Sequence, residues 1–192
     1  DNSAGIFGKN GTRLSNAALG TITMGNASAG IMTSGANSSA INDGAIILGA
    51  GSQGIYVKDG AIIQNNGTIT NSGVLATGAI GMYADNVSTN PIENSGTIQL
   101  TGDKSIGIYK IGAGIINNTG IGIIEVGESA NPDDPSIGIY SDNAGDIVNN
   151  TGIVTSGKKS IGIYSAGGTV NQNGTLDIGN MGVGIYSTNG TV

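Results

Sequence analysis

The sequence predicts an all-β protein that folds as a right-handed parallel β-helix (a solenoid) of about eight coils, with ~24 residues in each coil. A tripeptide, Gly-Ile-Tyr or a close variant of it, recurs eight times at spacings of 22 to 31 residues. A second motif, Ile-x-Asn-x-Gly-Thr-Ile, recurs in phase with the first. Repeats with periods of about 20–50 residues are typical of solenoids, in which each unit buries its apolar face against its neighbours.

The composition favours this architecture. The chain has 192 residues, of which 36 are Gly, 38% are hydrophobic and only 10% are charged. The hydrophobic residues are mostly Ile and Val, whose branched side chains favour strands, and Gly, Asn, Asp and Ser interrupt them as turns require. We therefore expect many short strands and tight turns, with almost no helix. The right-handed form is expected because parallel crossovers strongly prefer that hand and the six-residue period of left-handed β-helices is not seen.

The first strand of each coil is expected at the Gly-Ile-Tyr tripeptide. Side chains alternate between the two faces of a strand, so Ile106 and Ile108 should face the interior, and Gly107 and Tyr109 should face solvent. The repeated tyrosines then form an exterior aromatic strip, made of Tyr56, Tyr83, Tyr109, Tyr140, Tyr164 and Tyr186. Such a strip could dock a glycan or a protein, since Tyr combines apolar area with a polar tip. In-register aromatic stacking also stabilises a sheet by itself, and we favour that structural role.

The second motif is expected to supply the other main strand, over residues 63–69 and 92–98 in its clearest copies. Two corners join the two strands, and a third short strand is expected in the segment after each tyrosine. The asparagines of the motif form a column two residues before a turn glycine, and stacked Asn side chains can hydrogen-bond one another along the rod. This predicted ladder consists of Asn42, Asn65, Asn94, Asn118 and Asn150, with Gln172 as a substitute and Ala18 as a break. The turn glycines are expected to supply positive φ angles, and they are Gly20, Gly44, Gly67, Gly96, Gly120, Gly152 and Gly174.

Insertions gather at the corner that precedes the Gly-Ile-Tyr strand, near residues 71–78 and 125–135. Function in solenoids is often found in corners of variable length. We therefore expect a recognition loop there, with the candidate residues Glu125, Glu128, Asn131, Asp133 and Asp134. A tolerated insertion without a role is an equal alternative. The four carboxylates could bind calcium, but their spacing resembles no EF-hand, so we favour a solvated acidic loop and predict no metal.

The residue types argue against several functions. A net charge of −6 with seven scattered basic residues does not suit nucleic acid, and no apolar run approaches the ~20 residues that span a bilayer. Residues 1–10 lack the features of a signal peptide. The chain has no His, no Cys and no Gly-x-Ser-x-Gly turn, and Asp85, Asp142 and Asp146 fall in expected turns. We predict a non-enzyme with no catalytic residues and no cofactor.

The combination of Ser-Ile-Gly-Ile-Tyr with Ile-x-Asn-x-Gly-Thr-Ile resembles the passenger domains of large type V (classical) autotransporters, particularly the fusobacterial outer-membrane adhesins. The segments that carry the resemblance are 103–109 and 158–164. The resemblance implies a rod on the extracellular face of the bacterial outer membrane. It also implies attachment to other bacteria or to host cells through a surface protein or glycan. Such passengers leave the cell through an outer-membrane barrel, a route that the lack of Cys suits.

The resemblance further implies that residues 1–192 form a single β-helical segment excised from a longer passenger. That segment would stack on adjoining coils and would not itself enter the membrane. Two alternatives remain open. A β-helical polysaccharide-degrading enzyme, a hydrolase or a lyase, would need carboxylates gathered on a strand face, and a phage-type fibre shaft would need trimer signals.

Overall fold

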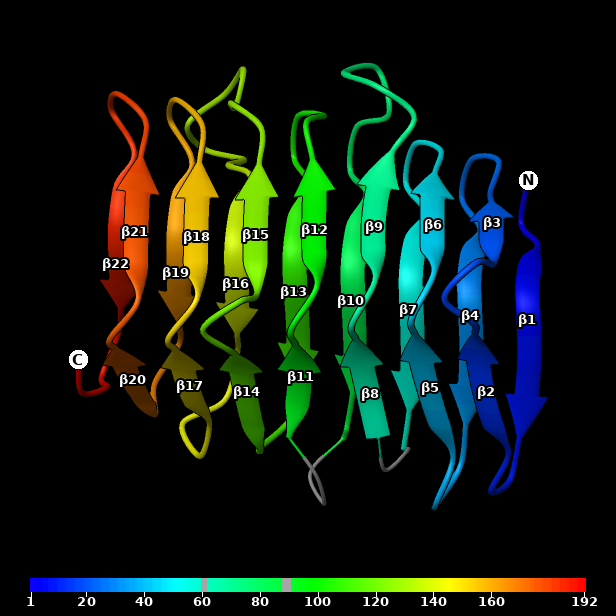
Figure 1. The fold of residues 1–192 in the computed structure, drawn as a ribbon. Coiled ribbons are helices and arrows are strands. Elements are labelled where there is room, and N and C mark those ends of the chain that lie inside the picture. Colours follow the sequence, from blue (N-terminus) through cyan, green and yellow to red (C-terminus); the bar gives the residue numbers. More distant parts are fainter. Residues whose placement is uncertain (60–61, 88–90) are drawn as a thin grey trace.

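The computed structural model describes residues 1–59, 62–87 and 91–192. All regular elements in these ranges are β-strands, and each complete coil contributes three of them (Figure 1). The first strands of the coils are β1 (Ala4–Lys9), β4 (Ala29–Ser34), β7 (Gln53–Lys58), β10 (Ile80–Asp85), β13 (Ile106–Ile111), β16 (Ile137–Ser141), β19 (Ile161–Ser165) and β22 (Val183–Ser187). The second strands are β2 (Arg13–Asn16), β5 (Ser39–Asn42), β8 (Ile62–Asn65), β11 (Ile92–Asn94), β14 (Ile115–Asn118), β17 (Ile147–Asn150) and β20 (Thr169–Gln172). The third strands are β3 (Thr21–Thr23), β6 (Ala45–Leu48), β9 (Thr68–Asn71), β12 (Thr97–Leu100), β15 (Ile123–Val126), β18 (Ile153–Ser156) and β21 (Thr175–Ile178).

Equivalent strands of successive coils pair in parallel and form three long sheets. One sheet has eight strands in the order β1-β4-β7-β10-β13-β16-β19-β22, and the other two have seven strands each. The chain rises along the near face and returns along the far face as it advances, which makes the solenoid right-handed (Figure 1). The predicted right-handed parallel β-helix is therefore confirmed. Seven coils are complete, and β22 begins an eighth.

The second sequence motif forms two strands instead of the one that was expected. The chain turns at Asn-x-Gly, because the N–H groups of Asn66 and Gly67 both donate to the carbonyl oxygen of Asn42 in the preceding coil, at 2.8 and 2.9 Å. The third strand of the coil thus comes from the Thr-Ile end of this motif. The segment directly after each tyrosine only continues the first strand, as β10 continues past Tyr83 to Asp85.

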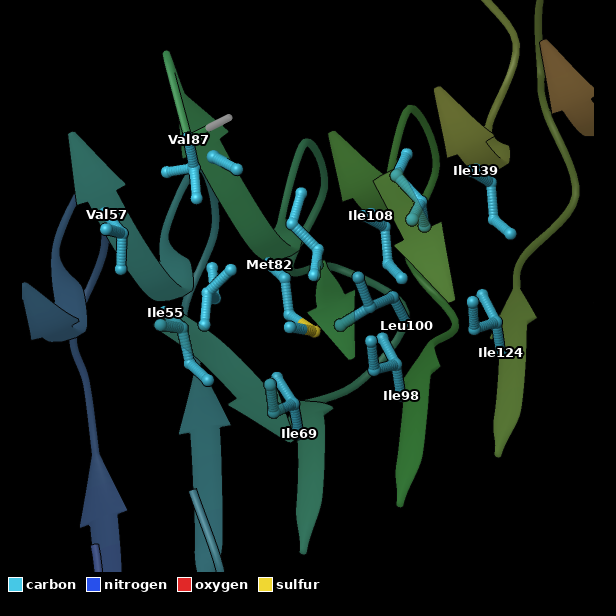
Figure 2. Packing of buried hydrophobic residues seen from close by; sticks show 14 of the residues in the cluster. Ile55, Val57, Ile69, Met82, Val87, Ile98, Leu100, Ile108, Ile124 and Ile139 are labelled. Atoms are coloured by element: carbon cyan, nitrogen blue, oxygen red, sulfur yellow. The ribbon is translucent and has the colours of Figure 1, made fainter. Parts of the chain in front are cut away.

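The core is a continuous stack of aliphatic side chains from all three sheets (Figure 2). Ile108 of the first sheet, Ile116 of the second and Ile124 of the third have no exposed surface. Their partners in adjacent coils are also Ile, Val or Met, since the register pairs Ile108 with Met82 and with Ile139. Full burial of such a side chain contributes about 1.5–3 kcal/mol. The stacked aliphatic columns therefore hold neighbouring coils together.

The strict two-residue alternation expected for the first strand is wrong at its start. In β13, Gly107 and Ile108 are both buried, whereas Ile106 and Tyr109 are half-buried. A Cβ on Gly107 would clash with Cγ2 of Ile124, so the glycine faces the core. Two consecutive residues point inward there because the backbone approaches the third sheet closely, and only glycine fits at the point of approach.

Candidate functional site

A column of buried asparagines runs through the rod at the end of the second strands. Each Nδ2 donates to the Oδ1 of the next coil, for example Asn65 to Asn94 at 2.9 Å and Asn94 to Asn118 at 2.8 Å. The same Nδ2 groups also donate to backbone carbonyls of the next turn, as Asn42 does to Thr68 at 3.1 Å. The full column is Asn16, Asn42, Asn65, Asn94, Asn118, Asn150 and Gln172. These amides satisfy one another, and their burial gives them a structural role.

The first coil continues this column through Asn16 and not through Ala18, where a break was expected. Asn16 pairs in register with Asn42, and its Nδ2 lies 2.9 Å from Oδ1 of Asn42. Counting two residues back from Gly20 failed because the corner between β2 and β3 is longer than most of the others. The corner after Asn118 is longer in the same way, so that Gly122, and not Gly120, aligns with Gly152.

The turn glycines do not have positive φ angles, contrary to the prediction. Their role is steric. A Cβ on Gly67 would clash with the carbonyl oxygen of Gly44, and a Cβ on Gly96 would clash with that of Gly67. The same carbonyls accept hydrogen bonds from the next coil, as Gly44 does from Thr68 N at 2.8 Å. Glycine is needed wherever a turn lies directly on the backbone of the turn before it, which holds for five of the seven turn glycines but not for Gly20 or Gly120.

The six tyrosines of the aromatic strip are paired in register and lie on the outside of the first sheet. Their ring centroids are 4.7 to 5.3 Å apart from one coil to the next. Four of the five steps are stacked, and the step from Tyr109 to Tyr140 is edge-on with an interplanar angle of 66°. Met32 and Phe7 extend the strip toward the first coil. The ring faces are largely covered by other rings, which leaves edges and hydroxyl groups for solvent.

Mutual covering also changes the acidity of the strip. Partial burial raises the pKa of Tyr56, Tyr83, Tyr109 and Tyr140, and it is the main cause in all four. The carboxylate of Asp85 adds a smaller rise in the pKa of Tyr56 and of Tyr83. A phenolate is disfavoured where water is displaced and where a negative charge is near. These four phenols are therefore neutral at physiological pH.

The two long corners lie at the same edge of the rod, between a third strand and the next first strand (Figure 1). One joins β9 to β10 through residues 72–79, and the other joins β15 to β16 through residues 127–136. A shallow hollow between them is lined by Val74, Thr101, Asp103, Glu128 and Ala130. The structure thus places both insertions around one depression.

The candidate acidic residues of the second corner do not converge on one point. Glu125 is half-buried in β15, where its Oε2 accepts a hydrogen bond from Gln99 at 2.8 Å. Asp134 forms an ion pair with Lys104 at 2.6 Å, and Asn131 Oδ1 accepts from the N–H of Asp133 at 3.1 Å. Asp134 raises the pKa of Lys104 through a hydrogen bond. Among the described residues, no group of three or more Asp, Glu, His or Cys side chains could hold a metal ion.

A buried ion pair lies in the core, and the sequence analysis did not identify it. Lys110 Nζ in β13 is 3.4 Å from Oδ1 of Asp146, and both side chains have no exposed surface. Asp146 had been placed in a turn, which is correct, but its side chain points inward. The sequence did contain an indication that Lys110 is buried. Lys110 follows Ile108 by two residues in a strand, so both side chains point to the same, inward face.

Comparisons of the chain with protein-family models, with curated proteins and with solved structures each found no match. No helix long and apolar enough to cross a membrane occurs in the part of the chain that the structure describes.

Proposed function

We propose that the chain is a segment of a bacterial cell-surface adhesin, displayed on the extracellular face of the outer membrane as part of a longer passenger. The observation that carries the proposal is the pair of long corners that emerge from one edge of the rod. The corners would bind a protein or glycan on other bacteria or on host cells. The stacked coils would hold that edge away from the membrane.

The first corner offers the apolar part of a binding surface. Val74 is 69% exposed and Leu75 is 89% exposed, although both are aliphatic. Exposed apolar side chains next to polar ones are typical of interaction sites. Asp103 and Glu128 border the hollow beside Val74 and supply that polar margin.

The rod itself suits a role as spacer. Its aliphatic core, asparagine column and aromatic strip all run from coil to coil without interruption by a second domain in the described residues. Each coil depends on its immediate neighbours for burial. A binding edge on such a rod keeps its position relative to the long axis.

An array of glycans and bacterial and host surface proteins tests the proposal directly. The double variant Val74→Asp/Leu75→Asp should lower binding to the captured ligand at least about tenfold, as loss of an apolar anchor does. Leu19→Asp is the matched control, because Leu19 is 100% exposed but lies in a different corner.

Deletion of residues 130–135 tests the second corner. This deletion spares Ser129, which is buried and whose Oγ lies 3.1 Å from that of Ser160. Binding at the level of the Leu19→Asp control, in both the deletion and the double variant, would rule out recognition at this edge. Polysaccharide cleavage that Asp133→Ala or Asp134→Ala abolishes would favour an enzyme instead.

A further inference from the structure

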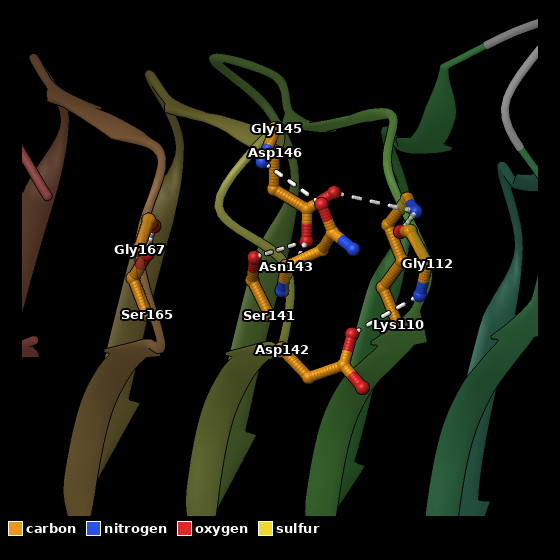
Figure 3. Close-up of polar contacts among 9 residues, drawn as sticks. All are labelled: Lys110, Gly112, Ser141, Asp142, Asn143, Gly145, Asp146, Ser165 and Gly167. Carbon is orange, nitrogen blue, oxygen red and sulfur yellow. Dashed lines mark hydrogen bonds and ion pairs between the residues drawn. The ribbon is translucent and has the colours of Figure 1, made fainter. Parts of the chain in front are cut away.

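We propose that Lys110 and Asp146 condense into an intramolecular amide, an isopeptide cross-link between two adjacent coils. Lys110 belongs to the coil of β13, and Asp146 lies just before β17 in the next coil. Their side chains meet inside the solenoid at the corner between the first and second sheets (Figure 3). The cross-link is a modification within the rod and does not depend on the proposed binding role.

The two oxygens of Asp146 have different surroundings. Oδ2 accepts hydrogen bonds from Oγ of Ser141 at 2.5 Å and from the N–H of Asn143 at 3.3 Å. Oδ1 is buried without a hydrogen bond and faces Lys110 Nζ at 3.4 Å. The carboxyl group is thus polarised at one oxygen and faces the amine at the other (Figure 3).

Amide formation requires the neutral forms of the pair. A buried ammonium and a buried carboxylate each lose hydration that the opposite charge only partly replaces. Transfer of one proton from Nζ to Oδ1 gives a neutral amine beside a neutral carboxylic acid. These are the reactive forms for amide formation, and they are held together in a site closed to water.

The step balances without an external reagent. The Nζ lone pair attacks Cγ of Asp146, an Nζ–Cγ bond forms, and negative charge develops on Oδ2. Ser141 and the Asn143 N–H stabilise that charge, as the donors of an oxyanion hole do. A second proton passes from Nζ to Oδ1, the Cγ–Oδ1 bond breaks, and one water molecule leaves. Lysine and aspartate are consumed, and one amide and one water are formed.

The corner has room for this lysine. Lys110 occupies a register position held by Ala84 in the coil before and by Ser141 in the coil after. A Cβ on Gly114 would lie 2.8 Å from Cε of Lys110, so that glycine leaves the space which the lysine stem fills. Nζ also donates to the carbonyl oxygen of Gly112, which fixes it at the end of β13.

Two exposed ion pairs serve as internal controls. Lys58 and Asp85 are 3.2 Å apart, and Lys104 and Asp134 are 2.6 Å apart, but all four side chains reach solvent. Hydration keeps these pairs charged, and water competes for the carboxyl carbon. They should therefore remain unlinked in the same sample.

Mass spectrometry of the intact 192-residue chain is the test, and the expected mass is lower than the sequence mass by one water molecule. Digestion with trypsin and a Glu-specific protease then locates the link. The linked product joins segment 105–125, uncut at Lys110, to segment 129–158. An unlinked chain gives 105–110, 111–125 and 129–158 separately, and that result would overturn the proposal.

Loss of water elsewhere is distinguished by the same digest. A succinimide at Asp43-Gly44 also removes one water, but it leaves the segments that contain Lys110 and Asp146 separate. A mass deficit confined to that site counts against the cross-link. In Lys110→Met the joined segment should be lost entirely, because the nucleophile is absent.

A matched pair of variants tests the mechanism. Ser141→Ala removes one donor to Oδ2 and should slow cross-linking about 100-fold after cell-free synthesis of the chain. Ser165→Ala is the control, because Ser165 is the buried register partner of Ser141 in the next coil and its Oγ donates to Gly167 instead. Equal rates in the two variants would show that Ser141 has no part in the reaction.

Discussion

At the scale of single residues, the rod depends on buried polar groups that satisfy one another. Asn94 is fully buried; its Oδ1 accepts from Asn65 and its Nδ2 donates to Asn118. A buried amide is costly only when its partner is removed. The column therefore stabilises the rod as a set and makes each member sensitive to substitution.

We predict that Asn94→Ala lowers the free energy of unfolding substantially. The change leaves the Oδ1 of Asn118 without a partner and leaves the Nδ2 of Asn65 with only its 3.4 Å bonds to the carbonyl oxygens of Gly67 and Thr97. An unsatisfied buried group costs about 1–3 kcal/mol. Denaturant unfolding followed by circular dichroism measures the change. Asn66→Ala is the control, because Asn66 bonds Asp43 at an exposed position and should shift stability by less than about 0.5 kcal/mol. Equal effects of the two variants would contradict the role given to burial.

At the scale of an element, the corner between the second and third strands is shaped by the backbone beneath it. Gly67, Gly96 and Gly174 each lie so close to the preceding turn that a side chain would clash with its carbonyl oxygen. Gly120 differs, because it sits in one of the two longer corners and its nearest atom, the Thr151 oxygen, is 4.0 Å from where a Cβ would lie. Glycines that look equivalent in the sequence motif therefore differ in whether their position can accept a side chain.

We expect Gly96→Ala to destabilise the protein by about 1–3 kcal/mol, the usual cost of overpacking, and Gly120→Ala to be tolerated. The added methyl group in Gly96→Ala forces two stacked turns apart and weakens the hydrogen bond from Thr97 N to Gly67 O, now 2.9 Å. Thermal melting of the two variants measures the difference. A larger loss in Gly120→Ala than in Gly96→Ala would show that conformation, and not space, selects these glycines.

At the scale of the whole molecule, the aromatic strip links successive coils of the first sheet from β7 to β22. Its rings cover one another, and burial raises the pKa of Tyr56, Tyr83, Tyr109 and Tyr140. In the unfolded chain each phenol returns to its ordinary pKa near 10. Between the two values, the folded state holds more protons than the unfolded state.

The contribution of these four phenols to stability should therefore be constant below about pH 9 and should fall as the pH rises through 10 toward their raised pKa values in the folded chain. The ultraviolet absorbance of tyrosinate against pH reports the ionisation, and denaturant unfolding at each pH reports the stability. Tyr109→Phe, which keeps the ring but removes the hydroxyl, should reduce the slope of the decline. If stability declined with pH as steeply in this variant as in the parent chain, the aromatic strip would not be the source of the decline.

Much of the fold could be predicted because the same chemistry recurs at the same position in every coil. The aliphatic column of Ile108 and the aromatic column of Tyr109 follow directly from the repeated tripeptide. The inward turn of Gly107 could not be predicted, because it depends on how near the third sheet comes to the backbone. Asn16 was missed for a related reason, since a longer corner displaced the glycine used to locate it.

The candidate site was less predictable than the fold. Corner lengths indicated that the insertions near residues 71–78 and 125–135 share an edge, but not that Asp134 pairs with Lys104 there. The contact between Lys110 and Asp146 depends on the path of the corner after Ser141, which has no counterpart of equal length in the coil before. Pairings that occur once leave no periodic trace in a sequence.

The register of the coils has a consequence for how such a chain can change over generations. A residue inserted within a strand would move every following side chain out of its column, and the aliphatic, amide and aromatic stacks would fail together. A residue inserted in the corner before a first strand disturbs none of them, as the segments 72–79 and 127–136 already demonstrate. Insertions can thus add new surface at the corners before the first strands, one coil at a time, while the residues of the interior columns stay unchanged.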